Sequence, residues 1–304
     1  MRGENSAGGR ALGVLRLDFW TLVMVATLAV MGVLLVWPLL QVLGTGFVDA
    51  ETQSFTLDNY VKVLTHRYYL GALWNTILVG VGGMIGACLL GVRLAYCMAR
   101  YVVKGGALVS TLTVMALVSP PFIGAYSWIV VLGNNGWLTQ QLRGLGLDVP
   151  AIYGVHGILL VFSLKFFPFV YLMTESALRN INRSLEEAAD NLGCSSLERF
   201  FKVTLPLVFP ATSSGAILCF VLSIADFGTP SIIGRDFRTL STIAYNQYTS
   251  EMGGTPSMAV SISMLMIVIS MLAVALQRYL ISKRRYTGSL TNRNVQKPCT
   301  GWKG

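Results

Sequence analysis

Charged residues are scarce in this sequence. Only 12% of its 304 residues are Asp, Glu, Lys or Arg, whereas 54% are apolar, and the mean hydropathy is +0.61. A soluble domain carries about 25% charged residues. The composition therefore excludes an ordinary soluble enzyme and a disordered protein. The length would suffice for two soluble domains, but the composition predicts one polytopic membrane domain.

Residues and motifs typical of catalysis are scarce as well. The chain has two histidines, His66 and His156, and both fall near the expected outer surface. It contains no H-E-x-x-H zinc motif, no G-x-S-x-G nucleophile motif and no G-x-x-x-x-G-K-[ST] phosphate loop. Its five cysteines include no C-x-x-C pair, so neither a disulfide framework nor a zinc site is supported. We expect no catalytic residue, no metal site and no cofactor, and we expect that the chain is not an enzyme.

Long uncharged runs predict six transmembrane helices and an all-α membrane fold. A span needs about 20 apolar residues to cross roughly 30 Å of hydrocarbon. The expected spans are 19–43, 68–92, 107–132, 153–174, 207–227 and 256–278. The third span contains Pro120-Pro121, which breaks a helix. Gly82 and Gly86 form a G-x-x-x-G pair in the second span, which allows another helix to approach closely.

Basic residues predict the orientation of these spans, because cytoplasmic loops retain Lys and Arg. Most of the 23 basic residues lie on one side, in the terminal segments and in the loops after the second and fourth spans. The opposite side has Lys62, Arg67, Arg143, Arg235 and Arg238. We therefore expect cytoplasmic N and C termini, with a segment 1–18, a six-helix domain 19–281 and a basic tail 282–304. The net charge of +9 then reflects topology, and we expect no nucleic-acid partner.

The longest expected cytoplasmic loop contains residues 183–206, and its first part has the signals of a short helix. Ser184 and Glu187 have the spacing of a capping box, in which each side chain binds a free backbone N–H group. Helix-forming residues follow, and Gly193 suits the position just after a helix, where φ is positive. We therefore predict a helix that ends in a glycine turn.

The second part of the same loop predicts another short helix. Ser195 or Ser196 can cap it, and Glu198 stands three residues after Ser195. Apolar residues then recur at helical spacing, and Pro206 is expected to end this helix and open the fifth span. A hairpin of two short helices on the cytoplasmic surface either rests on lipid or docks a partner.

The loop residues match a known motif at its full spacing. Glu187-Ala188-Ala189 is followed at the correct intervals by Gly193, Val203 and Leu205-Pro206. This resembles the EAA loop of ABC-importer permeases, whose pattern is Glu-Ala-Ala, x3, Gly, x9, Ile, x, Leu-Pro. Val203 in place of Ile is the one departure, and it keeps a β-branched apolar side chain. The resemblance extends from about residue 75 to about residue 280.

The resemblance implies a type I importer permease fold in the bacterial inner (cytoplasmic) membrane. In that family the short helix of the loop sits in a groove of a cytoplasmic ATPase. Carried over to this sequence, the coupling residues are Glu187, Ala188, Ala189, Gly193, Leu205 and Pro206. The implied partners are two ABC ATPase subunits, a second permease subunit (identical or related), a periplasmic or lipid-anchored solute-binding protein, and membrane lipid. ATP hydrolysis would belong to the ATPase subunits.

Two further stretches, 119–128 and 225–230, resemble the permeases for ferric iron, phosphonates, polyamines and related small solutes. The ferric-iron members look most similar, which implies iron transport as one role. Those members commonly join two permease halves in one chain, whereas this sequence has one half. That implies a second copy or a sister permease, since two halves enclose a path.

Four residues within or beside the spans are candidates for the solute path or a gate. Pro120 and Pro121 leave backbone carbonyls inside a span without hydrogen-bond partners. Either these carbonyls line a water-filled cavity, or the two prolines only kink the helix. Lys165 lies in the fourth span, where it either snorkels to the interface or pairs with an acid such as Asp226. Asp226 is either part of a path or an ordinary residue at the outer end of the fifth span.

Two other classes of protein stay open at this point. A secondary transporter driven by an ion gradient predicts an inverted repeat and several acids inside the membrane. No convincing repeat is visible, and Asp226 is nearly alone. An integral membrane enzyme predicts a catalytic pair, which the sequence lacks. The predicted function is therefore the permease subunit of an ATP-driven importer, with the secondary transporter as the alternative.

Overall fold

The structure is a computed structural model that describes residues 19–49, 54–118, 120–147, 150–250 and 254–283. Within these ranges the secondary structure is helical, and the one β contact is an isolated bridge between Val48 and Phe55. The all-α prediction is therefore confirmed for this part of the chain. The predicted segment 1–18 and the basic tail from residue 284 onwards lie outside the described residues.

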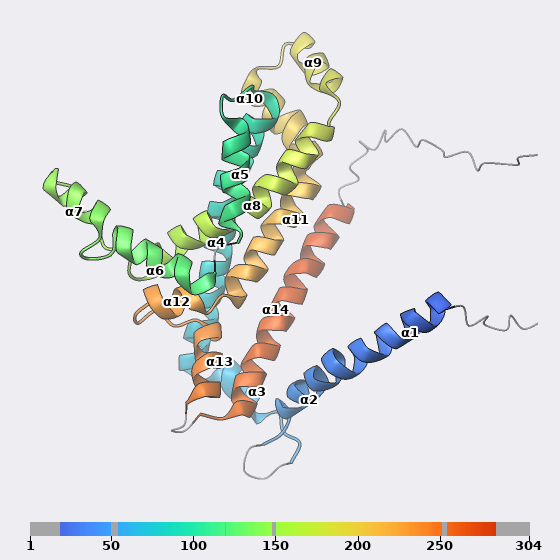
Figure 1. The fold of residues 1–304 in the computed structure, drawn as a ribbon, viewed down its shortest axis with the longest axis vertical. Coiled ribbons are helices and arrows are strands. Elements are labelled where there is room, and N and C mark those ends of the chain that lie inside the picture. The colour runs from blue at the N-terminus through green and yellow to red at the C-terminus, as the bar shows by residue number, and fades with distance from the viewer. Residues whose placement is uncertain (1–18, 50–53, 119, 148–149, 251–253, 284–304) are drawn as a thin grey trace, which may run out of the picture.

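Figure 1 labels the helices in chain order. Their bounds are α1 Phe19–Met31, the π-helical turn η1 Gly32–Val36, α2 Trp37–Thr45, α3 Asp58–Thr65, α4 Arg67–Arg100, α5 Gly106–Ala116, α6 Pro121–Leu132, α7 Trp137–Gly144, α8 Val155–Asn180, α9 Arg183–Asn191, α10 Ser196–Arg199, the π-helical turn η2 Phe200–Thr204, α11 Leu205–Ala225, α12 Gly228–Ile233, α13 Leu240–Thr249 and α14 Pro256–Lys283. In the described ranges, 5 helical stretches are long and apolar enough to cross a membrane: 19–45, 67–100, 155–180, 196–225 and 256–283. They correspond to the first, second, fourth, fifth and sixth expected spans.

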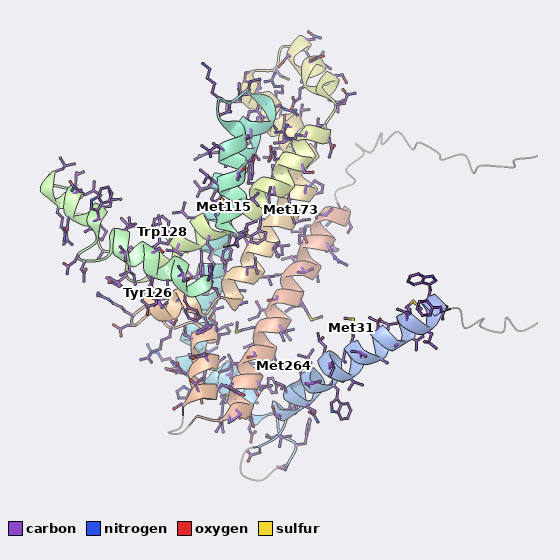
Figure 2. All side chains as sticks on the ribbon, in the orientation of Figure 1. Met31, Met115, Tyr126, Trp128, Met173 and Met264 are labelled. Carbon is purple, nitrogen blue, oxygen red and sulfur yellow. The ribbon has the colours of Figure 1, made fainter. Side chains whose placement is uncertain are left out.

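The third expected span is not one helix. Residues 107–132 divide into α5, with 11 residues, and α6, with 12 residues. Pro120 has extended backbone angles of φ −59° and ψ 142°, as expected for a residue that precedes a proline. Helix α5 runs along the bundle beside α8, whereas α6 and α7 extend sideways from it (Figure 1). Figure 2 shows Met115 on α5 before this break and Tyr126 and Trp128 on α6 after it.

Helices α4, α8 and α11 form the packed centre of the molecule, and glycines allow their close approach. A Cβ atom built on Gly82 would lie 2.4 Å from Cδ2 of Leu159, and one on Gly86 would lie 1.8 Å from Oγ of Ser163. Both contacts are between α4 and α8. The predicted close approach at this G-x-x-x-G pair is therefore confirmed. Gly215 on α11 also allows a close approach to α8, because a Cβ there would lie 2.9 Å from the Cα of Val170.

The remaining elements lie at the two ends and on one side of this centre. The helices α9 and α10 are at one end, and α3 and α13 are at the opposite end (Figure 1). Helix α14 packs on α13 and α11, and its lower part also contacts α2. Helix α1 leans away from the bundle, and none of its residues is buried.

Candidate functional site

The residues of the candidate coupling loop form a helical hairpin at one end of the bundle. Helix α9 begins after Asn182, whose side chain accepts a hydrogen bond from the backbone N–H of Ser184 at 3.1 Å. The predicted capping box of Ser184 and Glu187 is therefore wrong. Asn182 is itself a favourable N-cap residue, and it starts the helix two residues earlier. The first turn consequently contains Glu186 rather than Glu187.

The glycine turn after α9 is confirmed. Gly193 has φ +83°, and its N–H donates to the carbonyl of Asp190 at 2.9 Å. The N–H of Cys194 donates to the carbonyl of Ala189 at 3.1 Å. These two bonds form a Schellman motif, which ends a helix with a residue in the left-handed region. A Cβ on Gly193 would meet nothing within 4 Å, so the demand for glycine here comes from the backbone conformation alone.

The second half of the hairpin has the predicted cap but a different end. The Ser195 side chain accepts from the backbone N–H of Glu198 at 3.3 Å, and a Glu198 carboxylate oxygen accepts from the backbone N–H of Ser195 at 3.1 Å. The capping box of these two residues is confirmed. Pro206, however, does not end this helix, because the chain continues as one helical stretch over 196–225.

A π-helical turn at 200–204 explains how the helix passes Pro206. The backbone N–H of Leu205 donates to the carbonyl of Phe200, five residues earlier. A proline in an ordinary α-helix removes one hydrogen bond and clashes with the carbonyl four residues before it. The wider turn shifts the hydrogen-bond register just before Pro206, so the proline is accommodated without a break. Such turns are frequent at functional sites.

Glu186 ties the hairpin to the rest of the molecule. Its Oε1 accepts from Nη2 of Arg100 at 2.8 Å and from the hydroxyl of Thr204 at 2.9 Å. The side chains of Arg100 and Glu186 are only 10% and 12% exposed. Arg100 is the last residue of α4, so this contact joins α9 to the centre of the bundle. Sequence reasoning missed the pair because its members lie 86 residues apart and no local pattern links them.

The residues of the motif point in different directions. Glu187, Ala188 and Gly193 are exposed, whereas Ala189 is buried at 6% exposure, so the first three are open to a partner in this structure. Leu205 packs against the buried cluster that contains Tyr171. We use the name "hairpin face" for five exposed residues of the hairpin: Leu185, Glu187, Ala188, Leu192 and Leu197.

Lys165 and Asp226 form an ion pair in the interior of the bundle. Lys165 is in the middle of α8, and Asp226 follows directly after α11. Their side chains are 20% and 6% exposed. The other carboxylate oxygen of Asp226 accepts from the backbone N–H of Thr229 at 2.9 Å. Of the two alternatives for Lys165, the structure therefore has the paired side chain rather than the snorkelling one.

A cavity lies beside this ion pair, where the third span is broken. Its volume is about 390 Å³. The lining residues are Ala116, Leu117, Lys165, Phe166, Phe169, Leu222, Ala225 and Asp226. Pro120 and Pro121 start α6 and are not part of this lining. They shape the cavity indirectly, because the break that they cause leaves the end of α5 at its wall.

This arrangement places a cation and an anion side by side at the wall of a cavity. In the described ranges no group of three or more His, Cys, Asp or Glu side chains could hold a metal ion. A buried ion pair contributes little net stability, but loss of one partner leaves a costly unpaired charge. The cavity therefore contains two opposite charges that depend on each other.

Comparison with known proteins places the chain in a family. Residues 87–286 match the family described as the inner membrane component of binding-protein-dependent transport systems. The chain belongs to this family. A permease protein of the sn-glycerol-3-phosphate transport system of Escherichia coli is 31% identical over 248 residues, which are 78% of this chain and 83% of that protein.

Other relatives of this inner membrane component carry different solute names. A ferric transport system permease protein of Actinobacillus pleuropneumoniae is 26% identical over 289 residues, 94% of this chain. This chain spans only 40% of the length of that relative. A putative 2-aminoethylphosphonate transport system permease protein of Salmonella typhimurium is 27% identical over 261 residues, 84% of this chain and 90% of that protein.

Solved structures show the same fold. A chain of a bacterial ABC transporter involved in the import of the acidic polysaccharide alginate superposes with a TM-score of 0.72 at 16% identity. The match covers 88% of this chain and 96% of that chain. The predicted importer-permease fold is thereby confirmed. With its 5 long apolar helices, this inner membrane component is a multi-pass protein of the bacterial inner membrane.

Proposed function

We propose that the chain is the permease subunit of an ATP-driven ABC importer and that the hairpin face docks a cytoplasmic ATPase subunit. The exposed apolar residues of this face carry the proposal. Leu185, Leu192 and Leu197 are 47%, 86% and 73% exposed, and they lie beside the exposed Glu187 and Ala188. Exposed apolar side chains that form a patch on a protein surface mark an interaction site.

The path from the hairpin face to the solute side runs through one continuous helix. The stretch 196–225 has 30 residues and is therefore about 45 Å long. It begins at the hairpin and ends at Asp226, which holds Lys165. Movement of the hairpin would thus displace the residue that pairs with Lys165 beside the cavity. Rigid movements of packed helices around a fixed site are a common form of alternating access.

The further partners follow from the family. A second permease subunit, either another copy or a related chain, would complete the solute path. A periplasmic or lipid-anchored binding protein would deliver the solute from outside. The names of the relatives suggest a ferric solute or a small anion such as a phosphonate or sugar phosphate. Hydrolysis of ATP would take place on the ATPase subunits and not on this chain.

Association with the ATPase tests the docking surface. The full chain, expressed with its ABC ATPase subunit, is captured through a tag, and the ATPase recovered is quantified. Glu187→Lys and Gly193→Pro are expected to reduce recovery and ATP-driven uptake. Lys202→Gln is the control, because Lys202 is exposed and lies outside the hairpin face. Undiminished recovery and uptake with both test variants would contradict the proposal.

The energy source separates this proposal from the secondary transporter. In sealed right-side-out or reconstituted vesicles, uptake is measured with ATP enclosed on the ATPase side and with proton or sodium gradients imposed separately. Dependence on ATP and on the ATPase subunit is the expected result. Uptake that follows a gradient alone, without ATP, would favour the secondary transporter and contradict the importer.

A further inference from the structure

A second cavity lies beyond the end of α11 that is remote from the hairpin. It has a volume of about 200 Å³ and lies between α12, α13 and the segment that connects them. We call it the arginine hollow. Its lining residues are Tyr68, Phe227, Pro230, Ser231, Arg235, Phe237, Arg238, Thr242, Ile243, Tyr245 and Asn246. The lining contains two guanidinium groups, several hydroxyl groups and an amide, but no carboxylate.

Aromatic rings position the two arginines. The Cζ atom of Arg235 lies 4.0 Å from the ring centroid of Tyr153, and that of Arg238 lies 5.3 Å from the ring centroid of Tyr68. Among the described residues, neither arginine forms an ion pair. The hollow thus contains two guanidinium groups, and the exposed Asp236, which lies between them in the sequence, is not among its lining residues.

The backbone holds both arginines in place. Arg235 has φ +51°, a left-handed conformation that non-glycine residues adopt only where the surrounding structure enforces it. The carbonyl of Ile233 accepts from the N–H of Gly154 at 2.9 Å, and the carbonyl of Arg238 accepts from the side-chain amide of Asn75 at 2.9 Å. The segment 233–238 is thus fixed to α4 and to the start of α8. A non-glycine residue in the left-handed region is one of the features that occur at ligand sites.

The arginine hollow adjoins the buried ion pair. Phe227 lines the hollow, and the residue before it, Asp226, lines the inner cavity. The Phe227 ring stacks on Tyr245 with 4.5 Å between centroids and meets Phe122 edge-on at 5.3 Å. An aromatic cluster therefore stands beside both cavities.

We propose that the arginine hollow binds a small oxyanion, specifically a phosphate or phosphonate group carried by the solute. A guanidinium presents paired N–H groups that match such oxygens bidentately. Drug-sized ligands occupy about 300–1,000 Å³, so a smaller cavity suits an ion or a small solute. The positive lining disfavours a polyamine or an uncomplexed metal cation. This inference rests on the proposed function, because it assigns the hollow to the solute path.

The test measures binding to the full chain without its partners. The purified chain in phospholipid-free detergent is dialysed against radiolabelled inorganic phosphate and, separately, methylphosphonate. Arg235→Gln with Arg238→Gln is expected to weaken binding at least about tenfold, since both charged hydrogen-bond donors of the site are lost. The double variant Arg235→Lys with Arg238→Lys keeps both charges but cannot bind oxygens bidentately. Its affinity for phosphate is expected to lie between that of the unmodified chain and that of the Gln double variant.

The matched control removes the same number of positive charges. Lys62→Gln with Arg143→Gln lies outside the hollow and is expected to bind phosphate as the unmodified chain does. If both double variants lost phosphate binding equally, the binding would be a nonspecific attraction of phosphate to positive charge, and the proposal would be overturned. Binding of spermidine in preference to phosphate would also overturn it. Circular dichroism and gel filtration of each variant report its folding.

Two further outcomes distinguish related explanations. Added phosphatidylglycerol that abolishes phosphate binding would assign the hollow to a lipid head group and contradict a solute site. Persistence of phosphate binding in its presence supports the proposal. ATPase recovery by the Arg235→Gln/Arg238→Gln chain is expected to be normal. If even the unmodified chain recovers no ATPase, the proposed function fails, whereas the phosphate measurement still decides the hollow.

Discussion

Glu186 and Arg100 form a buried ion pair that fastens α9 to the end of α4. Their atoms Oε1 and Nη2 are 2.8 Å apart, and Thr204 donates to the same oxygen at 2.9 Å. One carboxylate thus connects the hairpin, the long second span and the π-helical turn before α11. This geometry allows a displacement of α9 to reach both helices, instead of only bending the loop.

Loss of the Glu186 charge is therefore expected to uncouple the hairpin. Glu186→Gln leaves the largely buried Arg100 without its partner, which costs about 3–5 kcal/mol at a fully buried pair and less here. Thermal unfolding in detergent should show a lower midpoint, and ATP-driven uptake should fall more than ATPase recovery. Glu198→Gln is the control, because its pair with Lys202 is exposed. Equal effects of both variants would contradict a special role for Glu186.

Lys165 and Asp226 are expected to depend on each other. Lys165→Met leaves Asp226 buried without its cation, and Asp226→Asn leaves Lys165 without its anion, so each is expected to abolish uptake. The charge swap Lys165→Asp with Asp226→Lys should recover part of the activity. Recovery will be incomplete, because the backbone N–H of Thr229 then faces a cation. Transport in vesicles measures all three, and a swap as inactive as the single variants would count against the pairing.

The contact between α4 and α8 at Gly86 is expected to tolerate no added atom. Gly86→Ala places a Cβ 1.8 Å from Oγ and 2.7 Å from Cβ of Ser163, so overpacking should cost about 1–3 kcal/mol. Gly71→Ala in the same helix is the control, since its Cβ meets nothing within 4 Å. That control should be neutral or stabilising by up to about 1 kcal/mol. The unfolding midpoints of the two variants compare these costs directly.

The glycine turn after α9 is expected to select residues by backbone conformation. Gly193→Val forces a β-branched residue to φ +83°, which costs roughly 1–2 kcal/mol or more. Gly193→Asn should keep most ATPase recovery and uptake, because Asn adopts the left-handed region far more readily. The space around position 193 is open, so a steric clash does not explain a difference. Equal activity of the two variants would show that the turn is not required.

The sequence predicted most of the fold because its signals are local. Apolar runs located the long helices, and Ser195 with Glu198 and Gly193 with its positive φ were confirmed as cap and turn. The prediction at Ser184 was wrong because Asn182, two residues earlier, caps the helix instead. The error at Pro206 arose because a π-helical turn changes which hydrogen bond a proline removes. The hydrogen-bond register of this turn is set by the neighbouring residues and by tertiary contacts.

The sequence by itself determined the membrane class, the positions of the long helices and the family motif in the loop. Those properties depend on hydrophobicity and spacing along the chain. The tertiary structure alone decided that Glu186 pairs with Arg100, that Lys165 pairs with Asp226 and that Arg235 and Arg238 share a cavity without an acid. The ion pairs join residues far apart in the sequence. Such partners are selected only when packed helices bring buried charges together, because an unpaired charge is too costly to bury.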